Sequence, residues 1–527
     1  MIGRTRSCWL LLWVVLAGCG ASEDAALIRA GEDNRPNILL IIADDLGYTD
    51  LGVFGSEIRT PNIDAIAQDG MLLTQFHTGP ACAYTRAMLL SGNNNHVAGV
   101  ARQNSPGLVG SSVQGYEGVL SDRIMPLPRL LRDAGYHTYS VGKWHLGMDD
   151  ENSPHAEGFT QSYNLLSGAG SHFDSTGLRE GGSRYREGPD LAEYPNGRYS
   201  TDVYTDKLIE FIESNRGDGK PFFAYAAYTA PHWPIQVPDD YLDIYAGQYD
   251  DGYDILRERR FDRLKEAGII STAQALPPRN DAVTSWDALT PEQKRIESRK
   301  MELYAAMVQN LDDHVGRLIA YLKDSDLHGN TLLVFMSDNG ADGSNHYETG
   351  PFSNYLQANY TTELEKMGTA ESFISVGMPW AEASSAPFQR FKGFSRQGGI
   401  VSPLLVAGPG IASRGVIDGS YLTVMDLAPT FLEIAGAEYP NDGSVVPMLG
   451  ESAVAFFAGE ASSIHDDDYV TLQYANGRAY LRQGDWKISN LDRPFSEDNF
   501  ELFDLSADPG ESVDVSTEEP EKFAELI

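Results

Sequence analysis

The sequence predicts an α/β protein with a large mixed, mostly parallel sheet sandwiched by helices, and a smaller antiparallel α+β domain at the C-terminus. Two observations predict this fold. Continuous apolar runs, beginning with residues 37–43, are typical of strands buried on both faces of a sheet, and they alternate with helical patterns. Beyond about Glu438 the pattern changes to short alternating strands. A chain of 527 residues with 42% hydrophobic composition is long enough for both units.

Five apolar runs are predicted to be central strands: 37–43, 136–141, 221–228, 331–336 and 403–407. Helical patterns lie between them at 126–134, 202–214, 291–323 and 423–435. Because strands and helices alternate, the sheet should be parallel or mixed and covered on both faces. The main domain is expected to span residues 35–437.

Two polar stretches, 239–290 and 342–386, interrupt this alternation and are rich in Gly, Asn and Tyr. We expect them to be insertions that shape the mouth of a pocket. A surface excursion without a role is the alternative for the first of them.

The C-terminal domain is expected to span residues 438–527. Its clearest signal is Asn476-Gly477 between two alternating runs, which is typical of a tight β-hairpin. Residues 486–488 and 501–504 are predicted to add two more strands.

The N-terminus has the pattern of an export signal. Two arginines precede an apolar run at 9–17 that is too short to span a bilayer but suits a secretory segment. The run ends in Leu16-Ala17-Gly18-Cys19, which resembles the lipobox of bacterial lipoproteins. We therefore expect a signal peptide at 1–19, a flexible tether at 20–34, and a periplasmic or outer-membrane lipoprotein whose only membrane contact is a lipid on Cys19. An ordinary cleaved signal is the alternative.

The formal net charge of −35 argues against nucleic acid as a partner. An anionic substrate would need a local cationic pocket. Of the three cysteines, two leave or are lipidated with the signal, so Cys82 is expected to be the one free thiol and disulfides are not expected. A cysteine beside an arginine, at a predicted helix start, points to a chemical role.

Polar side chains follow four of the predicted strands directly. These are Asp44-Asp45, Lys143-Trp144-His145, His232-Trp233 and Asp338-Asn339. In open α/β sheets, sites form where strands end, so these groups should meet at one edge.

Four oxygen-bearing residues in this set suit a hard divalent ion: Asp44, Asp45, Asp338 and Asn339. Calcium and magnesium prefer such ligands, whereas zinc prefers nitrogen and sulfur. An adjacent Asp pair taken alone is more often a turn or helix cap, and the second pair reverses that interpretation.

With these residues in view, the chain resembles the type I sulfatases of the alkaline phosphatase superfamily, and most closely the long bacterial arylsulfatases. The resemblance runs from about Arg35 to the end, in family order. The matching segments are Arg35-Pro36-Asn37 with Asp44-Asp45, Arg59-Thr60-Pro61-Asn62-Ile63-Asp64, the Cys82 segment, Gly142-Lys143-Trp144-His145-Leu146-Gly147, Pro231-His232-Trp233-Pro234, Ser337-Asp338-Asn339-Gly340, Trp380, Lys392, Gln397-Gly398-Gly399-Ile400 and Arg482-Gln483-Gly484-Asp485-Trp486-Lys487.

The resemblance implies hydrolysis of aryl or carbohydrate sulfate monoesters. A maturation enzyme would oxidise Cys82 to formylglycine, whose hydrate attacks sulfur. The residue roles carried over from the family are calcium ligation by Asp44, Asp45, Asp338 and Asn339, support of the hydrate by Arg86 and Lys143, contact with the sulfate and the leaving oxygen by His232 and Lys392, and proton acceptance by His145.

One position departs from the family. Its maturation signal is usually Cys-x-Pro-x-Arg or Cys-x-Ala-x-Arg, and Tyr84 stands at the middle position here. Tyrosine does not restrict the chain toward an extended form as proline does, so conversion could be less efficient, need a tolerant enzyme, or not occur. Two alternatives therefore accompany the sulfatase hypothesis: hydrolysis of phosphonate monoesters or phosphodiesters, and non-catalytic binding of sulfated glycans by the unconverted protein.

Overall fold

The computed structural model describes residues 35–103 and 113–527. The predicted signal peptide at 1–19, the lipid anchor at Cys19 and the tether at 20–34 lie outside the described residues. Within the described ranges, no helix is long and apolar enough to cross a membrane.

The main body is built on a ten-stranded sheet with the order β10-β2-β9-β8-β1-β7-β3-β4-β5-β6. The strands are β1 (Asn37–Ala43), β2 (Met71–His77), β3 (His137–Lys143), β4 (Gln161–Leu165), β5 (Tyr185–Glu187), β6 (Asp190–Ala192), β7 (Phe222–Ala227), β8 (Thr331–Ser337), β9 (Val401–Ala407) and β10 (Val416–Thr423). The central strands β8, β1, β7 and β3 are adjacent and parallel. Their carboxyl ends therefore share one edge, as the sequence predicted.

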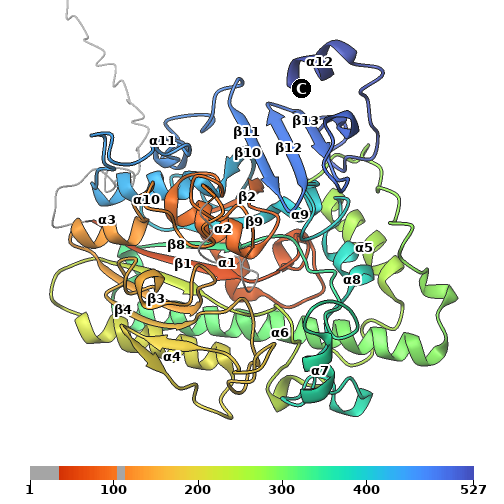
Figure 1. The fold of residues 1–527 in the computed structure, drawn as a ribbon, viewed down its shortest axis with the longest axis horizontal. Coiled ribbons are helices and arrows are strands. Elements are labelled where there is room, and N and C mark those ends of the chain that lie inside the picture. Colours follow the sequence, from red (N-terminus) through yellow and green to blue (C-terminus); the bar gives the residue numbers. More distant parts are fainter. Residues whose placement is uncertain (1–34, 104–112) are drawn as a thin grey trace, which may run out of the picture.

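Helices cover both faces of this sheet (Figure 1). The helices of the described residues are α1 (Pro61–Asp69), α2 (Cys82–Ser91), α3 (Leu127–Asp133), α4 (Ser200–Asn215), α5 (Tyr253–Glu266), α6 (Pro291–Asp324), α7 (Ser353–Asn359), α8 (Met378–Ser384), α9 (Gln397–Ile400), α10 (Leu427–Ala435), α11 (Val454–Phe457) and α12 (Pro520–Leu526), the last of which packs on the C-terminal sheet. Alternate residues of β1 point to opposite faces. Leu39 and Ile41 pack with α1, α4 and α6, while Leu40 and Ile42 pack with α2, α3 and α10. The predicted fold class is confirmed.

A separate four-stranded antiparallel sheet follows the main body, with strands in sequence order. It comprises β11 (Val470–Ala475), β12 (Arg478–Gln483), β13 (Trp486–Asn490) and β14 (Glu501–Asp504). Asn476 and Gly477 join the first two strands with φ of 54° and 76°, the left-handed values that a type I′ turn requires. The predicted hairpin is confirmed.

Parts of the sheet differ from the sequence-based expectation. β9 runs antiparallel to both of its neighbours, β2 and β8, and β2 was not predicted. The segment 239–290 does more than shape a pocket mouth, because its helix α5 packs against α8 and buries Leu256, Phe261 and Leu264. The segment is thus packed into the main body, and its role stays a prediction.

Candidate active site

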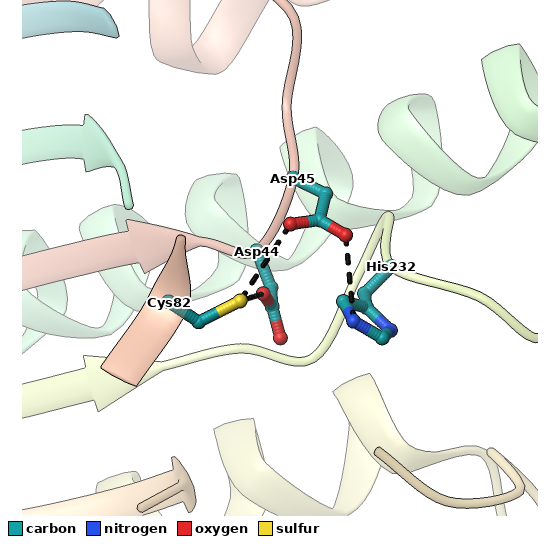
Figure 2. Close-up of side chains that lie close together, drawn as sticks. All are labelled: Asp44, Asp45, Cys82 and His232. Carbon is teal, nitrogen blue, oxygen red and sulfur yellow. Dashed lines mark hydrogen bonds and ion pairs between the residues drawn. The ribbon is translucent and has the colours of Figure 1, made fainter. Parts of the chain in front are cut away.

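The side chains that follow the central strands gather with the first residue of α2. Figure 2 shows Cys82, Asp44, Asp45 and His232 pointing toward one another, and their ligand atoms all lie within 4.8 Å of each other. The Cys82 Sγ lies 3.3 Å from Asp44 Oδ1 and 3.7 Å from Asp45 Oδ1. Cys82 is fully buried and is the free cysteine of the described residues.

The Cys82 thiol is poorly suited to act as a nucleophile in its unmodified form. Burial, together with Asp338 and Asp44 nearby, raises its pKa well above the ordinary value. Because the thiolate is the reactive form of cysteine, the environment suppresses thiol chemistry. The helix start nevertheless directs backbone N–H groups and a partial positive charge to this position, which favours an anion.

Two buried cations lie beside Cys82. Lys143 Nζ is 2.6 Å from Asp44 Oδ2. Arg86, one turn into α2, donates through Nε and Nη2 to Asp338 Oδ2 at 3.1 and 2.7 Å, and through Nη1 to the carbonyl of Lys143 at 2.7 Å. Both side chains are fully buried. Both cations are therefore paired with buried carboxylates, and they place donor groups beside Cys82.

A third cation reaches the site from the loop before α9. Lys392 Nζ lies 2.7 and 2.8 Å from the two carboxylate oxygens of Asp45 and 3.2 Å from Asp342 Oδ2. Although burial alone would lower the pKa of Lys392, Asp342 and Asp45 raise it well above its ordinary value. This lysine is therefore held as a cation.

The predicted metal ligands fit a hard cation. Asn339 Nδ2 donates to Asp45 Oδ1 at 2.7 Å, which turns the amide oxygen away from that carboxylate. Asn339 Oδ1 is buried and has no hydrogen-bond partner among the described residues. Burial and Asp338 raise the pKa of Asp44, and burial raises the pKa of Asp45 well above its ordinary value even though Lys392 opposes the shift. A divalent cation would give the unpaired Asn339 oxygen a partner and would balance the charge of the buried carboxylates.

Asp338 is the most constrained of the four. Its Oδ1 accepts from the backbone N–H of Asp45 at 3.3 Å, and its Oδ2 accepts from Arg86. Burial acts to raise its pKa, but Arg86, Lys143 and Lys392 hold that pKa below the ordinary value. Asp338 is thus ionised, and it joins the predicted ligands to the cations.

Two histidines complete the predicted set. His232 Nδ1 donates to the carbonyl of Trp233 at 2.6 Å, which leaves Nε2 facing Asp45 Oδ2 at 3.4 Å. His145 follows β3 with a left-handed φ of 62°, and the ring fits because residue 168 is glycine, where a Cβ would lie 2.6 Å from the imidazole. Burial, with Lys143, Arg86 and Lys392 nearby, lowers the pKa of His145 well below its ordinary value.

Sequence reasoning missed Asp342, which joins the site to its surroundings. Its Oδ2 accepts from Lys392 and from Trp233 Nε1, the latter at 2.8 Å. Its position three residues after the predicted ligand Asn339 could have suggested it. The centroid of the Trp233 ring lies 4.2 Å from that of His232 and 4.7 Å from that of His346.

A cavity of about 600 Å³ lies next to His346, which is part of its lining. It is lined by residues 343–346 and 348–351, by Glu297 and Lys300 of α6, and by residues 377–379 at the start of α8. Ser344, in its lining, donates its backbone N–H to Asp342 Oδ1 at 2.8 Å. The second predicted insertion, 342–386, therefore borders a cavity beside the site.

A site of buried carboxylates, an unpartnered amide oxygen and three cations around one cysteine is suited to hold a hard divalent cation and an anion together. The sulfatase family model matches residues 36–437. The chain is 38% identical over 521 residues to an uncharacterized sulfatase of Schizosaccharomyces pombe, covering 95% of this chain and 94% of the relative. It is 38% identical over 440 residues to an arylsulfatase of Klebsiella aerogenes, covering 81% and 93%.

Among solved structures, Ps i-CgsB in complex with k-i-k-neocarrahexaose has the same fold, with a TM-score of 0.67 at 24% identity over 93% of this chain and 91% of that one. The chain belongs to the sulfatase family, and the predicted resemblance to type I sulfatases is confirmed. The protein is a sulfatase.

Proposed function

We propose that this sulfatase hydrolyses sulfate monoesters with a formylglycine made from Cys82 and a calcium ion held by Asp44, Asp45, Asp338 and Asn339. The observation that carries the proposal is the buried Cys82 thiol, 3.3 Å from Asp44 and with its pKa raised, in a site otherwise rich in cations. Such a thiol has no evident use until its sulfur is replaced by oxygen. That replacement would also remove the one soft ligand from an oxygen-rich donor set.

A formylglycine hydrate at residue 82 would supply an oxygen nucleophile, and a calcium ion held by the four oxygen ligands would supply positive charge for the sulfate oxygens. Arg86 and Lys143 hold Asp338 and Asp44 in place and keep positive charge beside residue 82. Preorganised charge of this kind stabilises the transition state without reorganisation.

The leaving oxygen is assigned to His232 and Lys392. The hydrogen bond from His232 Nδ1 to Trp233 fixes the ring, so that only Nε2 can exchange a proton with the ester. Lys392 is held as a cation and can donate to the departing oxygen. Asp342 orients it, because the ammonium lies between the carboxylates of Asp342 and Asp45.

His145 is assigned as the base that accepts a proton from residue 82. Its lowered pKa keeps the imidazole neutral, and its Nδ1 is buried without a hydrogen-bond partner in the described part of the chain. A neutral ring with an unengaged nitrogen is the form that can accept a proton.

The alcohol part of the ester is proposed to occupy the cavity lined by His346, whose ring packs against Trp233, and this favours carbohydrate sulfates. Glu297, Lys300 and Asn345 line that cavity with hydrogen-bonding groups. Sugar hydroxyls would pair with them, whereas an aryl group would remove them from water without partners. The Klebsiella aerogenes relative is named an arylsulfatase, so 4-nitrophenyl sulfate is the reference substrate.

The test starts from peptide mass spectrometry of the Cys82 segment after expression in a host with a formylglycine-generating enzyme. Formylglycine appears as sulfur exchanged for oxygen with the loss of two hydrogens. The converted protein is then assayed on 4-nitrophenyl sulfate, sulfated saccharides and a phosphonate monoester, with Cys82→Ala as the matched control. We expect sulfate ester hydrolysis that is absent in Cys82→Ala. Equal turnover by that variant, or higher kcat/KM on the phosphonate, would contradict the proposal.

Export as a lipoprotein belongs to the same proposal, on the strength of the Leu16-Ala17-Gly18-Cys19 pattern. Cys19→Ser should move the protein from the membrane fraction to the soluble fraction. An unchanged distribution would argue against a lipid anchor.

A further inference from the structure

A buried carboxylate lies directly behind the predicted metal-binding loop. Asp50 ends the segment that begins with Asp44 and Asp45, and its side chain is fully buried. Its Oδ2 accepts from the backbone N–H of Gly47 at 2.9 Å and from the Tyr304 hydroxyl at 2.7 Å, and its Oδ1 accepts from the Ser384 hydroxyl at 2.8 Å. Three separate parts of the chain thus converge on one carboxylate.

Arg260 of α5 supplies the charge that balances this carboxylate. Its Nη1 is paired with Asp50 Oδ1, and its Nη2 and Nε lie 2.7 and 3.1 Å from the two oxygens of Glu57. The Arg260 side chain is fully buried. We call Asp50, Arg260, Tyr304 and Ser384 the Asp50 network.

The Asp50 network also touches Asp45. The Tyr304 hydroxyl lies 3.4 Å from the carbonyl oxygen of Asp45, next to its bond to Asp50. Asp45 has a left-handed φ of 67°, a conformation that costs free energy for a residue with a side chain, although less for Asp than for most. Close packing adds to the constraint, since a Cβ on Gly47 would lie 2.4 Å from Ser384 Cβ.

We propose that Arg260 and Asp50 are positioning residues that set calcium affinity by holding the backbone of Asp45 in its strained conformation. This inference rests on the proposed calcium site. Groups that orient metal ligands from behind typically change metal affinity 10- to 100-fold when they are removed. A loop released from the Asp50 network would relax away from the left-handed form, and calcium binding would then have to order it again.

Through the Asp50 network, the insertion 239–290 would act on the proposed calcium site without touching it. α5 lies in that insertion, and Arg260 reaches Asp50 across 210 residues of sequence. Its guanidinium contacts neither the cysteine nor the predicted metal ligands through any bond in the described structure. Its effect must therefore pass through the loop.

The experiment measures calcium affinity of the purified full-length protein by isothermal titration calorimetry, together with melting temperatures with and without calcium. The variants are Arg260→Met and Tyr304→Phe. The matched control is Arg263→Met, on the same helix, which loses a bond from Nη1 to the carbonyl of Gly55 at 2.8 Å but no contact with Asp50. We expect the calcium Kd to rise about 10- to 100-fold in Arg260→Met, to rise by a smaller factor in Tyr304→Phe, and to stay within about twofold in the control.

The readouts separate positioning from simple stability. A lower melting temperature in the calcium-free protein with an unchanged Kd would overturn the inference, because it would make Arg260 a purely structural residue. If Arg260→Met fails to fold, Tyr304→Phe, which removes a single hydroxyl, is the test: an unchanged calcium Kd in this variant would overturn the inference. A parent protein that binds no calcium would overturn the calcium site of the proposed function itself, and the positioning role with it.

Discussion

Replacing Lys392 with methionine tests whether this lysine stabilises the leaving oxygen. The ammonium lies within 3.2 Å of Asp45 and Asp342 and is about 10% exposed, so water cannot readily replace it. Loss of one preorganised donor to a developing oxyanion reduces kcat by about 10²- to 10³-fold, or about 3–4 kcal/mol. We expect a loss of this size for Lys392→Met on a saccharide sulfate.

Substrates with different leaving groups distinguish a role of Lys392 at the leaving oxygen from a role elsewhere in the reaction. A phenolate such as 4-nitrophenolate needs little help to depart, whereas a sugar alkoxide needs a proton or a strong donor. The loss in kcat should therefore be clearly smaller for 4-nitrophenyl sulfate than for the saccharide. Steady-state kinetics on the two substrates, with parent and variant side by side, measures both losses.

Lys207→Met is the matched control. Lys207 forms surface ion pairs with Glu187 and Glu210, which contribute about 1 kcal/mol or less to stability. Its kcat should equal that of the parent on both substrates. Equal losses on the two substrates in Lys392→Met would refute the leaving-group role, and an undiminished kcat would refute any catalytic role.

Three further outcomes are expected. Chelation with EGTA should lower the melting temperature, because calcium at 100 times its Kd adds about 2.7 kcal/mol to the stability of the folded state; an unchanged melting curve would argue against a calcium site. Burial raises the pKa of Glu157 to about 7, although the charge of Arg129 opposes the shift. Between about pH 4.5 and 7 the folded chain therefore binds more protons than the unfolded chain, and the free energy of unfolding falls as pH rises through that window. Glu157→Gln should therefore be more stable than the parent at pH 8 by about 3 kcal/mol at most, an advantage that calorimetry should find absent at pH 4. Tyr84→Ala should increase the formylglycine content measured by mass spectrometry. It should also lower the free energy of unfolding in urea by about 3–5 kcal/mol, because loss of the buried ring leaves a cavity. An unchanged formylglycine content would show that Tyr84 does not hinder conversion.

The sequence predicted the middle of the main sheet because strands buried on both faces must be continuously apolar. β1, β7 and β8 are buried at every position. β10 lies at the edge with six of its eight residues exposed or partly exposed, and β2 carries Thr74 and Gln75 in its centre. Neither pattern is typical of a strand in the core. The antiparallel direction of β9 cannot be predicted from periodicity alone.

The site was predictable where residues follow strands and unpredictable where they come from elsewhere. The strand-end rule located Asp44, Lys143, His232 and Asp338, since neighbouring parallel strands end at one edge. Arg260 and Tyr304 lie on helices and reach Asp50 across more than 200 residues. Their role depends on how α5 and α6 pack, and no local pattern encodes that packing.

Cys82 is completely buried, and the helix that carries it is covered by late parts of the chain, since Gln473 bonds to Met88 across 385 residues of sequence. Under the proposed function, an enzyme that modifies an extended segment would have to reach Cys82 before the chain folds. A segment converted slowly because of Tyr84 would then leave part of the folded protein unconverted, and the activity of a preparation would depend on how long the chain stays unfolded after synthesis.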